Sequence, residues 1–185
     1  MKTIQIQGME LQEATQVING LDPPGAQQKW ADLGCGSGLF TFALAHRLPP
    51  ESVIFAVDKS PVVLDNLPNP NRVFIQKTQS DFINDPLDFR DLDGILMANS
   101  LHFVNDKIPF LSKLQRCLKP QGHLLLIEYN TDVPNRWVPY PTSYSSLKKL
   151  LESTGFTSVT KLGERPSLYR KGGIYALTAT LFKIK

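Results

Sequence analysis

The sequence has few of the features that mark exported, membrane-spanning or metal-binding proteins. It contains only two cysteines, Cys35 and Cys117, in 185 residues. Two cysteines cannot build a disulfide framework, and these two show no metal-ligand spacing. No window approaches the run of about 20 apolar residues that a membrane helix needs, and the opening MKTIQIQGMELQEA lacks the apolar segment of a signal peptide. These absences predict a cytoplasmic protein without a metal site or a membrane span.

A strong charge of one sign is also missing. The chain has 20 Lys or Arg residues against 17 Asp or Glu, a formal net charge of +3, which does not by itself predict a nucleic-acid partner. From Lys161 to the end, however, six cations (residues 161, 165, 170, 171, 183 and 185) stand against one acid, Glu164. This cluster has two interpretations. It is either a solvated edge hairpin that lysines protect from aggregation, or a surface that binds an anionic acceptor or nucleic acid.

The order of apolar segments predicts one α/β domain. Short apolar runs at 29–33, 53–58, 72–77, 93–99 and 123–129 are strand-like, and helical periodicity covers 9–20, 39–48, 107–118 and 142–154. A further helix is expected to start at Ser60-Pro61, an N-cap followed by proline. The early strands are continuously apolar, so both of their faces are buried, which predicts a parallel sheet between helices. The last two strands, near 157–165 and 173–183, lack an intervening helix and must form an antiparallel hairpin.

A glycine-rich stretch, WADLGCGSGLF at residues 30–40, follows the first predicted strand. Its spacing is G-x-G-x-G, with Leu39 where the dinucleotide fingerprint has a third glycine. Asp32, two residues ahead of the first glycine, would oppose a pyrophosphate but suits an ammonium group. The helix start that follows favours an anionic group. A ligand with an amino acid moiety satisfies both features, whereas a nicotinamide cofactor, which would make the protein an oxidoreductase, fits less well.

The segment ADLGCGSG resembles the first motif of the class I S-adenosylmethionine-dependent methyltransferases, and three more motifs follow in order. VIFAVDKSP resembles the second motif, LDGILMANSLHFV the fourth-strand motif, and RCLKPQGHLLLIEY the helix, turn and fifth strand. The resemblance covers roughly residues 29–130. As a whole, the sequence resembles the broad methyltransferase group that includes the ubiquinone-biosynthesis C-methyltransferases. The resemblance implies a doubly wound, Rossmann-like sheet of seven mostly parallel strands with a C-terminal antiparallel hairpin and helices on both faces. It also implies a single methyltransferase domain over 1–185, comprising an N-terminal helical cap (1–28), a cofactor-binding core (29–130) and an acceptor-side segment, helix and hairpin (131–185).

The resemblance assigns S-adenosylmethionine as cofactor and gives roles to individual residues. Asp32 and the glycine backbone would hold the methionine end, and Asp58 the ribose hydroxyls. The stem of Lys59 would pack on the adenine, whose edge would be read in the loop KTQSDF, where Gln79 ranks first and Asp81 is a further candidate. The residues expected at the cofactor are Asp32, Gly34, Cys35, Gly36, Gly38, Asp58, Lys59, Thr78, Gln79, Ser80, Ala98 and Asn99.

The acceptor is expected to be a small molecule. His102, just beyond the fourth strand, is the candidate general base, although it could instead pack or cap a loop. Trp137, Tyr140 and Tyr144 either line an acceptor pocket or pack under a Pro-rich loop, and cover would come from the N-terminal helix and the segments 131–144 and 164–173. ANSL stands where the adenine- and glutamine-N-methylating enzymes carry their Pro-Pro motif, which argues against those branches. The alternative function is a non-catalytic protein that binds S-adenosylmethionine or S-adenosylhomocysteine and acts through a partner. The acceptor atom and the oligomeric state stay open.

Overall fold

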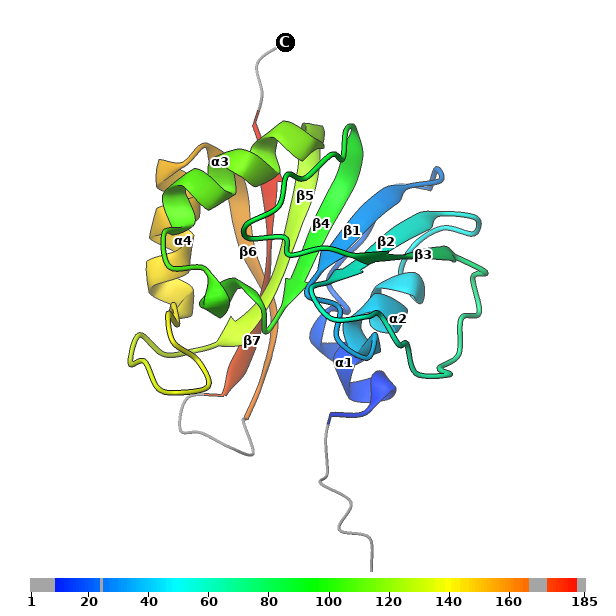
Figure 1. Ribbon diagram of the computed structural model, residues 1–185, viewed down its shortest axis with the longest axis horizontal. Coiled ribbons are helices and arrows are strands. Elements are labelled where there is room, and N and C mark those ends of the chain that lie inside the picture. Colours follow the sequence, from blue (N-terminus) through cyan, green and yellow to red (C-terminus); the bar gives the residue numbers. More distant parts are fainter. Residues whose placement is uncertain (1–8, 24, 167–172, 183–185) are drawn as a thin grey trace, which may run out of the picture.

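The computed structural model describes residues 9–23, 25–166 and 173–182, which are organised around one seven-stranded sheet (Figure 1). The strand order is β3-β2-β1-β4-β5-β7-β6. Parts of the predicted cap 1–28, of the loop 164–173 and of the C-terminal basic cluster (Arg170, Lys171, Lys183 and Lys185) lie outside the described residues. The strands are β1 Lys29–Leu33, β2 Val53–Asp58, β3 Phe74–Gln79, β4 Leu92–Ala98, β5 Leu118–Tyr129, β6 Phe156–Arg165 and β7 Ile174–Leu181. The helices are α1 Leu11–Val17, α2 Leu39–Ala45, the 3-10 turn η1 Leu101–Phe103, α3 Lys107–Cys117 and α4 Tyr144–Ser153.

The first five strands and β6 run in one direction, and only β7 runs in the opposite direction. β1 pairs in parallel with both β2 and β4, while β3 extends the sheet beyond β2 and β5 extends it beyond β4. β7 lies antiparallel to both β5 and β6. The predicted doubly wound sheet with its C-terminal hairpin is therefore confirmed, with small shifts such as β3 beginning at Phe74 instead of residue 72.

Successive residues of the central strands point to two separate cores, one on each face of the sheet. Trp30 and Leu125 pack with α1 and α2, whereas their chain neighbours Ala31 and Leu126 pack with α3 and α4. Figure 1 shows the two helix pairs on either side of the sheet. This alternation explains why the strands are apolar throughout, since both faces of a covered parallel sheet are buried.

The helix predicted after Ser60 is wrong, because residues 61–69 form neither helix nor strand. This extended segment lies beside α2, where hydrogen bonds hold it. The backbone N–H of Asp65 donates to the carbonyl of Ser37 at 2.8 Å. The side-chain amide of Asn71 donates to the final carbonyls of the α2 turn, including that of Leu48 at 2.8 Å. The segment is thus tied to the two ends of α2 through Asp65 and Asn71, and Pro68 and Pro70 disfavour helix at its end.

The ends of β1 and β4 form the point from which the chain leaves in opposite directions. From β1 the chain passes to β2 on one side, and from β4 it passes to β5 on the other. Connections that diverge in this way leave a crevice outside the carboxyl ends of the strands, where ligands bind in open α/β sheets.

Gly94 in β4 is required by the close approach of Trp30. A Cβ at position 94 would lie 2.4–2.5 Å from three atoms of the Trp30 ring, which is fully buried. The ring cannot retreat freely, because its Nε1–H donates to the side-chain oxygen of Gln28 at 2.7 Å.

We therefore expect Gly94→Ala to lower the free energy of unfolding by about 1–3 kcal/mol through overpacking. Gly25→Ala is the matched control, because its Cβ would meet no atom of the described residues within 4 Å. Urea unfolding measures both variants. Equal midpoints for the two would contradict the packing described for Trp30.

Candidate functional site

The glycine loop after β1 stands at the crevice and is fastened to β2. The N–H groups of Gly34 and Cys35 both donate to the carbonyl of Val57, at 2.8 and 3.0 Å. A Cβ at Gly34 would lie 2.6 Å from Cβ of Ser100, so this glycine allows the chain to pack on itself. Gly36 differs, because no described atom lies within 4 Å of the place where its Cβ would stand. Of these two positions, Gly36 is therefore the one whose backbone a ligand can approach freely.

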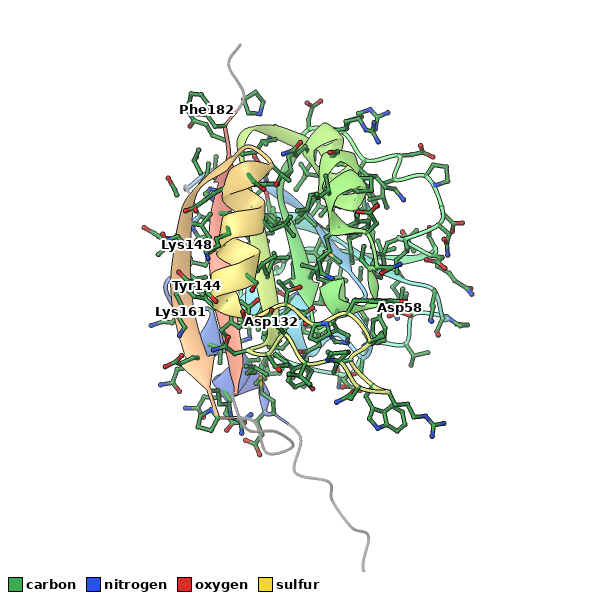
Figure 2. All side chains as sticks on the ribbon, turned by 90° about the vertical axis from the view of Figure 1, so that its left-hand side faces the viewer. Asp58, Asp132, Tyr144, Lys148, Lys161 and Phe182 are labelled. Carbon is green, nitrogen blue, oxygen red and sulfur yellow. The ribbon has the colours of Figure 1, made fainter. Side chains whose placement is uncertain are left out.

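Asp58 ends β2 with its carboxylate held by the backbone on both sides (Figure 2). Oδ2 accepts the N–H of Gly36 at 3.1 Å, and Oδ1 accepts the N–H of Ser60 at 2.9 Å. Each carboxylate oxygen has a second acceptor site. The side chain is thus fixed in the wall of the crevice while keeping the capacity to accept two further hydrogen bonds.

Asp32 is a buried carboxylate that is only half satisfied. Its Oδ2 accepts the hydroxyl of Thr41 at 2.5 Å, but its Oδ1 has no hydrogen-bond partner among the described residues. Burial raises the pKa of Asp32 to about 7, and the negative charge of Asp58 adds to this effect, while the Thr41 hydrogen bond opposes it. A buried oxygen without a donor is rare in native proteins, so the geometry favours a donor that comes with a ligand.

A cleft of about 160 Å³, open to solvent, adjoins the glycine loop and Asp58. It brings together Gly34, Asp58, Lys59 and Asn99 of the predicted cofactor residues, with the further candidate Asp81. Its wall consists of Gly34, Asp58, Lys59, Asp81, Phe82, Ile83, Asn99, Ser100 and Phe103.

Asn99 follows β4 in a conformation that is unusual for a residue other than glycine. Its φ is +53°, and its N–H donates to the carbonyl of Ile127 on β5 at 2.8 Å. The side-chain Oδ1 is buried and has no partner among the described residues. Left-handed residues and unpaired buried polar atoms both concentrate at functional sites, so Asn99 and Asp32 share one signature.

The residues after β3 that line the cleft differ from those ranked first by the sequence prediction. Thr78 and Gln79 still belong to β3, and the Gln79 amide donates to the carbonyl of Lys59 at 3.2 Å. The hydroxyl of Ser80 donates to Asp85. The wall of the cleft is formed by the next residues, Asp81 to Ile83, of which Asp81 was the further candidate. The Asp81 carboxylate accepts the side-chain amide of Asn84 at 2.9 Å, and this bond, with two backbone N–H bonds, lowers its pKa.

Three other predicted cofactor residues, Cys35, Gly38 and Ala98, are not part of the cleft wall. Cys35 is buried, and burial raises the pKa of its thiol to about 12, so it carries no thiolate at neutral pH. A Cβ at Gly38 would lie 2.8 Å from Leu64, which means that this glycine admits the segment after β2. Ala98 ends β4 and packs against the core on the α1–α2 face.

His102 forms a buried pair with a residue that the sequence analysis missed. Its Nδ1 lies 2.7 Å from Oε2 of Glu128, and its backbone N–H donates to Oε1 at 3.2 Å. The two side chains are 4% and 3% exposed. The other ring nitrogen, Nε2, has no hydrogen-bond partner among the described residues, and the rings of Phe103 and Tyr129 flank the imidazole at 4.4 and 5.9 Å. His102 therefore adjoins Phe103 of the cleft wall with one nitrogen unused.

The sequence carried one signal for Glu128. It is an acid near the end of the apolar strand LLLIEY, where a buried charge needs a partner. What the sequence could not show is that β4 and β5 are neighbours, which brings η1 beside the end of β5. Phe82, Ile83, Ser100 and Phe103 were also missed, and as apolar or small residues they carried no distinguishing pattern.

The three predicted acceptor-side aromatics have different environments. Tyr144 packs edge-on against Tyr175 at 5.6 Å, and Lys161 lies over its ring at 5.4 Å (Figure 2), which agrees with a packing role. Tyr140 donates its backbone N–H to the carbonyl of His102 at 3.0 Å. Trp137 is 75% exposed and carries Arg136 over its ring.

Within residues 9–23, 25–166 and 173–182, no cluster of three or more His, Cys, Asp or Glu side chains could hold a metal ion. None of the helices in the described part of the chain is long and apolar enough to cross a membrane.

Comparisons with known proteins agree with the geometry. A family model described as a methyltransferase domain matches residues 31–124. A curated relative, demethylmenaquinone methyltransferase of Lactobacillus johnsonii, is 28% identical over 129 residues, which is 65% of this chain and 53% of the relative. The chain thus spans about half the length of the curated relative that it matches.

Solved structures share the fold. The CurJ carbon methyltransferase is 22% identical, with a TM-score of 0.64 over 90% of this chain and 51% of its own. The 1,6-didemethyltoxoflavin-N1-methyltransferase of Burkholderia thailandensis, with bound S-adenosylhomocysteine, is 18% identical, with a TM-score of 0.66 over 94% of this chain and 78% of its own. With the family match over residues 31–124, these findings show that the chain belongs to the methyltransferase-domain family, the class I S-adenosylmethionine-dependent methyltransferases that its motifs resemble.

Proposed function

We propose that this protein transfers a methyl group from S-adenosylmethionine to a small-molecule acceptor whose reacting oxygen or carbon gives up a proton to His102. The observation that carries the proposal is the set of unused acceptors at the carboxyl edge of the sheet. Asp32 and Asn99 each keep one buried oxygen without a partner among the described residues, and Asp58 lines the cleft together with Asn99. A zwitterionic sulfonium nucleoside supplies donors for all three.

The residues in and around the cleft offer partners for the methionine, ribose and adenine parts of this cofactor. Asp32 and Asn99 would hold the ammonium of the methionine part beside the open backbone of Gly36, and Asp58 would accept from the ribose hydroxyls. Asp81 would accept from the adenine amino group, with Phe82 against the ring. When bound, the cofactor supplies a methyl group that its positive sulfur makes electrophilic.

The other predicted cofactor residues have supporting roles in this proposal. Lys59 lines the cleft, where its stem can cover the adenine with the amine in water. Gln79 supports Lys59 through the hydrogen bond to its carbonyl. Thr78, Ser80, Cys35, Gly38 and Ala98 shape the loops and strand ends that the contact residues need.

The His102–Glu128 pair would supply the base. A carboxylate at Nδ1 is an acceptor, so Nδ1 carries the proton and Nε2 keeps its lone pair. The acceptor's O–H or C–H proton would pass to Nε2, and the electron pair left behind would form the new bond to the methyl carbon as the bond from that carbon to the sulfur would break, which leaves S-adenosylhomocysteine. Glu128 would stabilise the imidazolium. Positioned proton transfer of this kind accelerates reactions by about 10²–10⁴-fold.

The relatives do not narrow the acceptor to one atom. Their names describe a demethylmenaquinone, a carbon and a ring-nitrogen methyltransferase. The base itself favours an acceptor that must lose a proton, because an amine that is already neutral needs no base before attack.

Replacing Asp58 by alanine tests the cofactor assignment. At a hundredfold excess over its Kd, S-adenosylhomocysteine should stabilise the unaltered protein by about 2.7 kcal/mol, a Tm rise of roughly 5–10 °C at this size. Asp58→Ala should abolish the rise, because two bonds to a charged acceptor contribute about 1.5–3 kcal/mol each. Asp88→Ala, which removes an exposed carboxylate, is the control and should keep it. A full shift in Asp58→Ala, or a shift with NAD alone, would refute the assignment.

The pH dependence of cofactor binding tests Asp32. Its folded-state pKa is raised to about 7, so below that pH the free protein holds a proton there that an incoming ammonium must expel. The affinity for S-adenosylhomocysteine should therefore fall by up to about tenfold per pH unit as the pH drops from 7 to 5. Calorimetry in buffers of different ionisation enthalpy should record proton release on binding. Asp32→Asn should bind more weakly at pH 8 and lose the slope; if it retains the slope, another group is responsible.

Substitution of the histidine and its partner tests the base. His102→Gln should slow the transfer of labelled methyl groups from S-adenosylmethionine into a small-molecule extract by about 10²–10⁴-fold. Glu128→Gln should slow it as well, and both variants should keep the affinity for S-adenosylhomocysteine within about twofold. His46→Gln, whose ring bonds to Pro68 on the outside of α2, is the control. Near-normal transfer by His102→Gln would remove His102 as the base.

A further inference from the structure

The backbone of His102 is held on both sides by hydrogen bonds from other elements. Its N–H donates to Oε1 of Glu128 on β5 at 3.2 Å, and its carbonyl accepts the N–H of Tyr140 at 3.0 Å. Tyr140 belongs to residues 131–143, which we call the acceptor-side loop. Oε2 of Glu128 lies 2.7 Å from Nδ1 of the imidazole. The position of the ring relative to this carboxylate therefore depends on the contact with Tyr140 as well as on Glu128 itself.

The amine of Lys107 holds Tyr140 beside η1. It donates to the carbonyl of Tyr140 at 2.8 Å and to the carbonyl of Val104 at 2.9 Å. Val104 stands two residues after His102 and is buried, and its own N–H donates to the carbonyl of Leu101 at 3.0 Å. The bonds thus close a ring that runs from His102 through Tyr140, Lys107 and Val104 and returns along the chain, with its base in the core.

Lys107 stands where a lysine is unfavourable by local criteria. It is the first residue of α3, and the helix dipole disfavours a positive charge at that end. It is half-buried, and burial lowers the pKa of its amine, although the charge of Glu128 opposes this effect. The two carbonyls that it binds carry no charge to offset the burial. Residues that break local rules in this way concentrate at functional sites.

The ends of the acceptor-side loop are tied to each other at the start of α4. Asp132 accepts the N–H and the hydroxyl of Ser143 at 2.8 and 2.7 Å, and Oδ1 of Asn130 accepts the N–H of Tyr144 at 3.0 Å (Figure 2). The loop is therefore closed on itself without help from α3. The bonds of Lys107 serve to join this closed loop to the turn that carries His102.

We propose that Lys107 is a positioning residue for the methyl transfer. By binding the carbonyls of Tyr140 and Val104, it holds the backbone of His102 where Glu128 reaches Nδ1, and so keeps Nε2 free to accept a proton. An ammonium suits this task because it carries three donors on one atom and satisfies carbonyls of two segments at once. The inference rests on the proposed function, since it concerns the base of the same reaction.

The ring nitrogens of His102 report on the positioning directly. We would record their NMR signals with isotope-labelled histidine and bound S-adenosylhomocysteine at alkaline pH, where histidine rings are neutral, and assign them with His102→Gln. The unaltered protein should show one protonated and one unprotonated nitrogen. In Lys107→Met, which removes the donors and keeps an apolar stem, the two signals should move towards each other as the tautomers mix. Hydrogen exchange of the Tyr140 N–H should accelerate about tenfold or more.

A second lysine of α3 supplies the matched control. The amine of Lys113 also donates to backbone carbonyls, those of Phe82 at 3.0 Å, Ile83 at 3.2 Å and Asp85, in the loop after β3. Lys113→Met should therefore leave the ring signals of His102 unchanged. Lys107→Arg should restore them, because a guanidinium also donates to two carbonyls. Mixed tautomers in both methionine variants, or in neither, would overturn the inference, as would an arginine variant that behaves like Lys107→Met.

The rate of methyl transfer separates positioning from stability. Lys107→Met should slow the transfer of labelled methyl groups about tenfold or more, because a misplaced base loses its alignment, while the affinity for S-adenosylhomocysteine stays within about twofold. Lys107→Arg should recover most of the rate. A lower Tm without a change in rate or tautomer would mean a purely structural role. Normal transfer by Lys107→Met beside slow transfer by His102→Gln refutes only the positioning, whereas normal transfer by His102→Gln refutes the proposed base.

Discussion

The divergence of the chain between β1 and β4 is the constraint on which the site depends. Because the five leading strands are parallel, their carboxyl ends share one edge, and the sheet order places the ends of β2, β1 and β4 side by side. Asp58, the glycine loop and Asn99 meet there although up to 65 residues (Gly34 to Asn99) separate them along the chain. The backbone bonds from the loop to Val57 and from Gly36 to Asp58 hold this meeting point together.

The same neighbour relation explains the acceptor side. β5 follows β4 in the sheet, so Glu128 near the end of β5 lies beside η1 and pairs with His102. A buried carboxylate is costly unless it is paired, and here the pairing also sets which imidazole nitrogen is free. The part of the cleft beyond β2 and β3 carries the carboxylates of Asp58 and Asp81, whereas the part beyond β4 carries the ring of Phe103.

Errors of the sequence analysis arose where contacts between distant segments outweigh local signals. Ser60-Pro61 is a good helix start, yet the chain after it stays extended, with Asp65 bonded to Ser37 before α2 and Asn71 bonded to Leu48 after it. The cleft wall beyond β3 is formed by Asp81 to Ile83, which follow the residues 78–80 expected to read the adenine edge, because β3 stays paired with β2 up to Gln79. All three loop glycines were expected at the cofactor, and the structure adds that Gly34 and Gly38 allow the close approach of Ser100 and Leu64.

The sequence by itself determined the strand and helix order, the parallel sheet, the hairpin and the family, since hydrophobic periodicity and the spacing of Gly34, Gly36 and Asp58 are local properties of the chain. It also named Asp32, Asn99 and His102 as candidates. Only the tertiary structure decided which polar atoms are left without partners, which glycine faces open space and which residue orients His102. Burial and pairing depend on segments that are distant in the sequence, and no local pattern records which of them become neighbours.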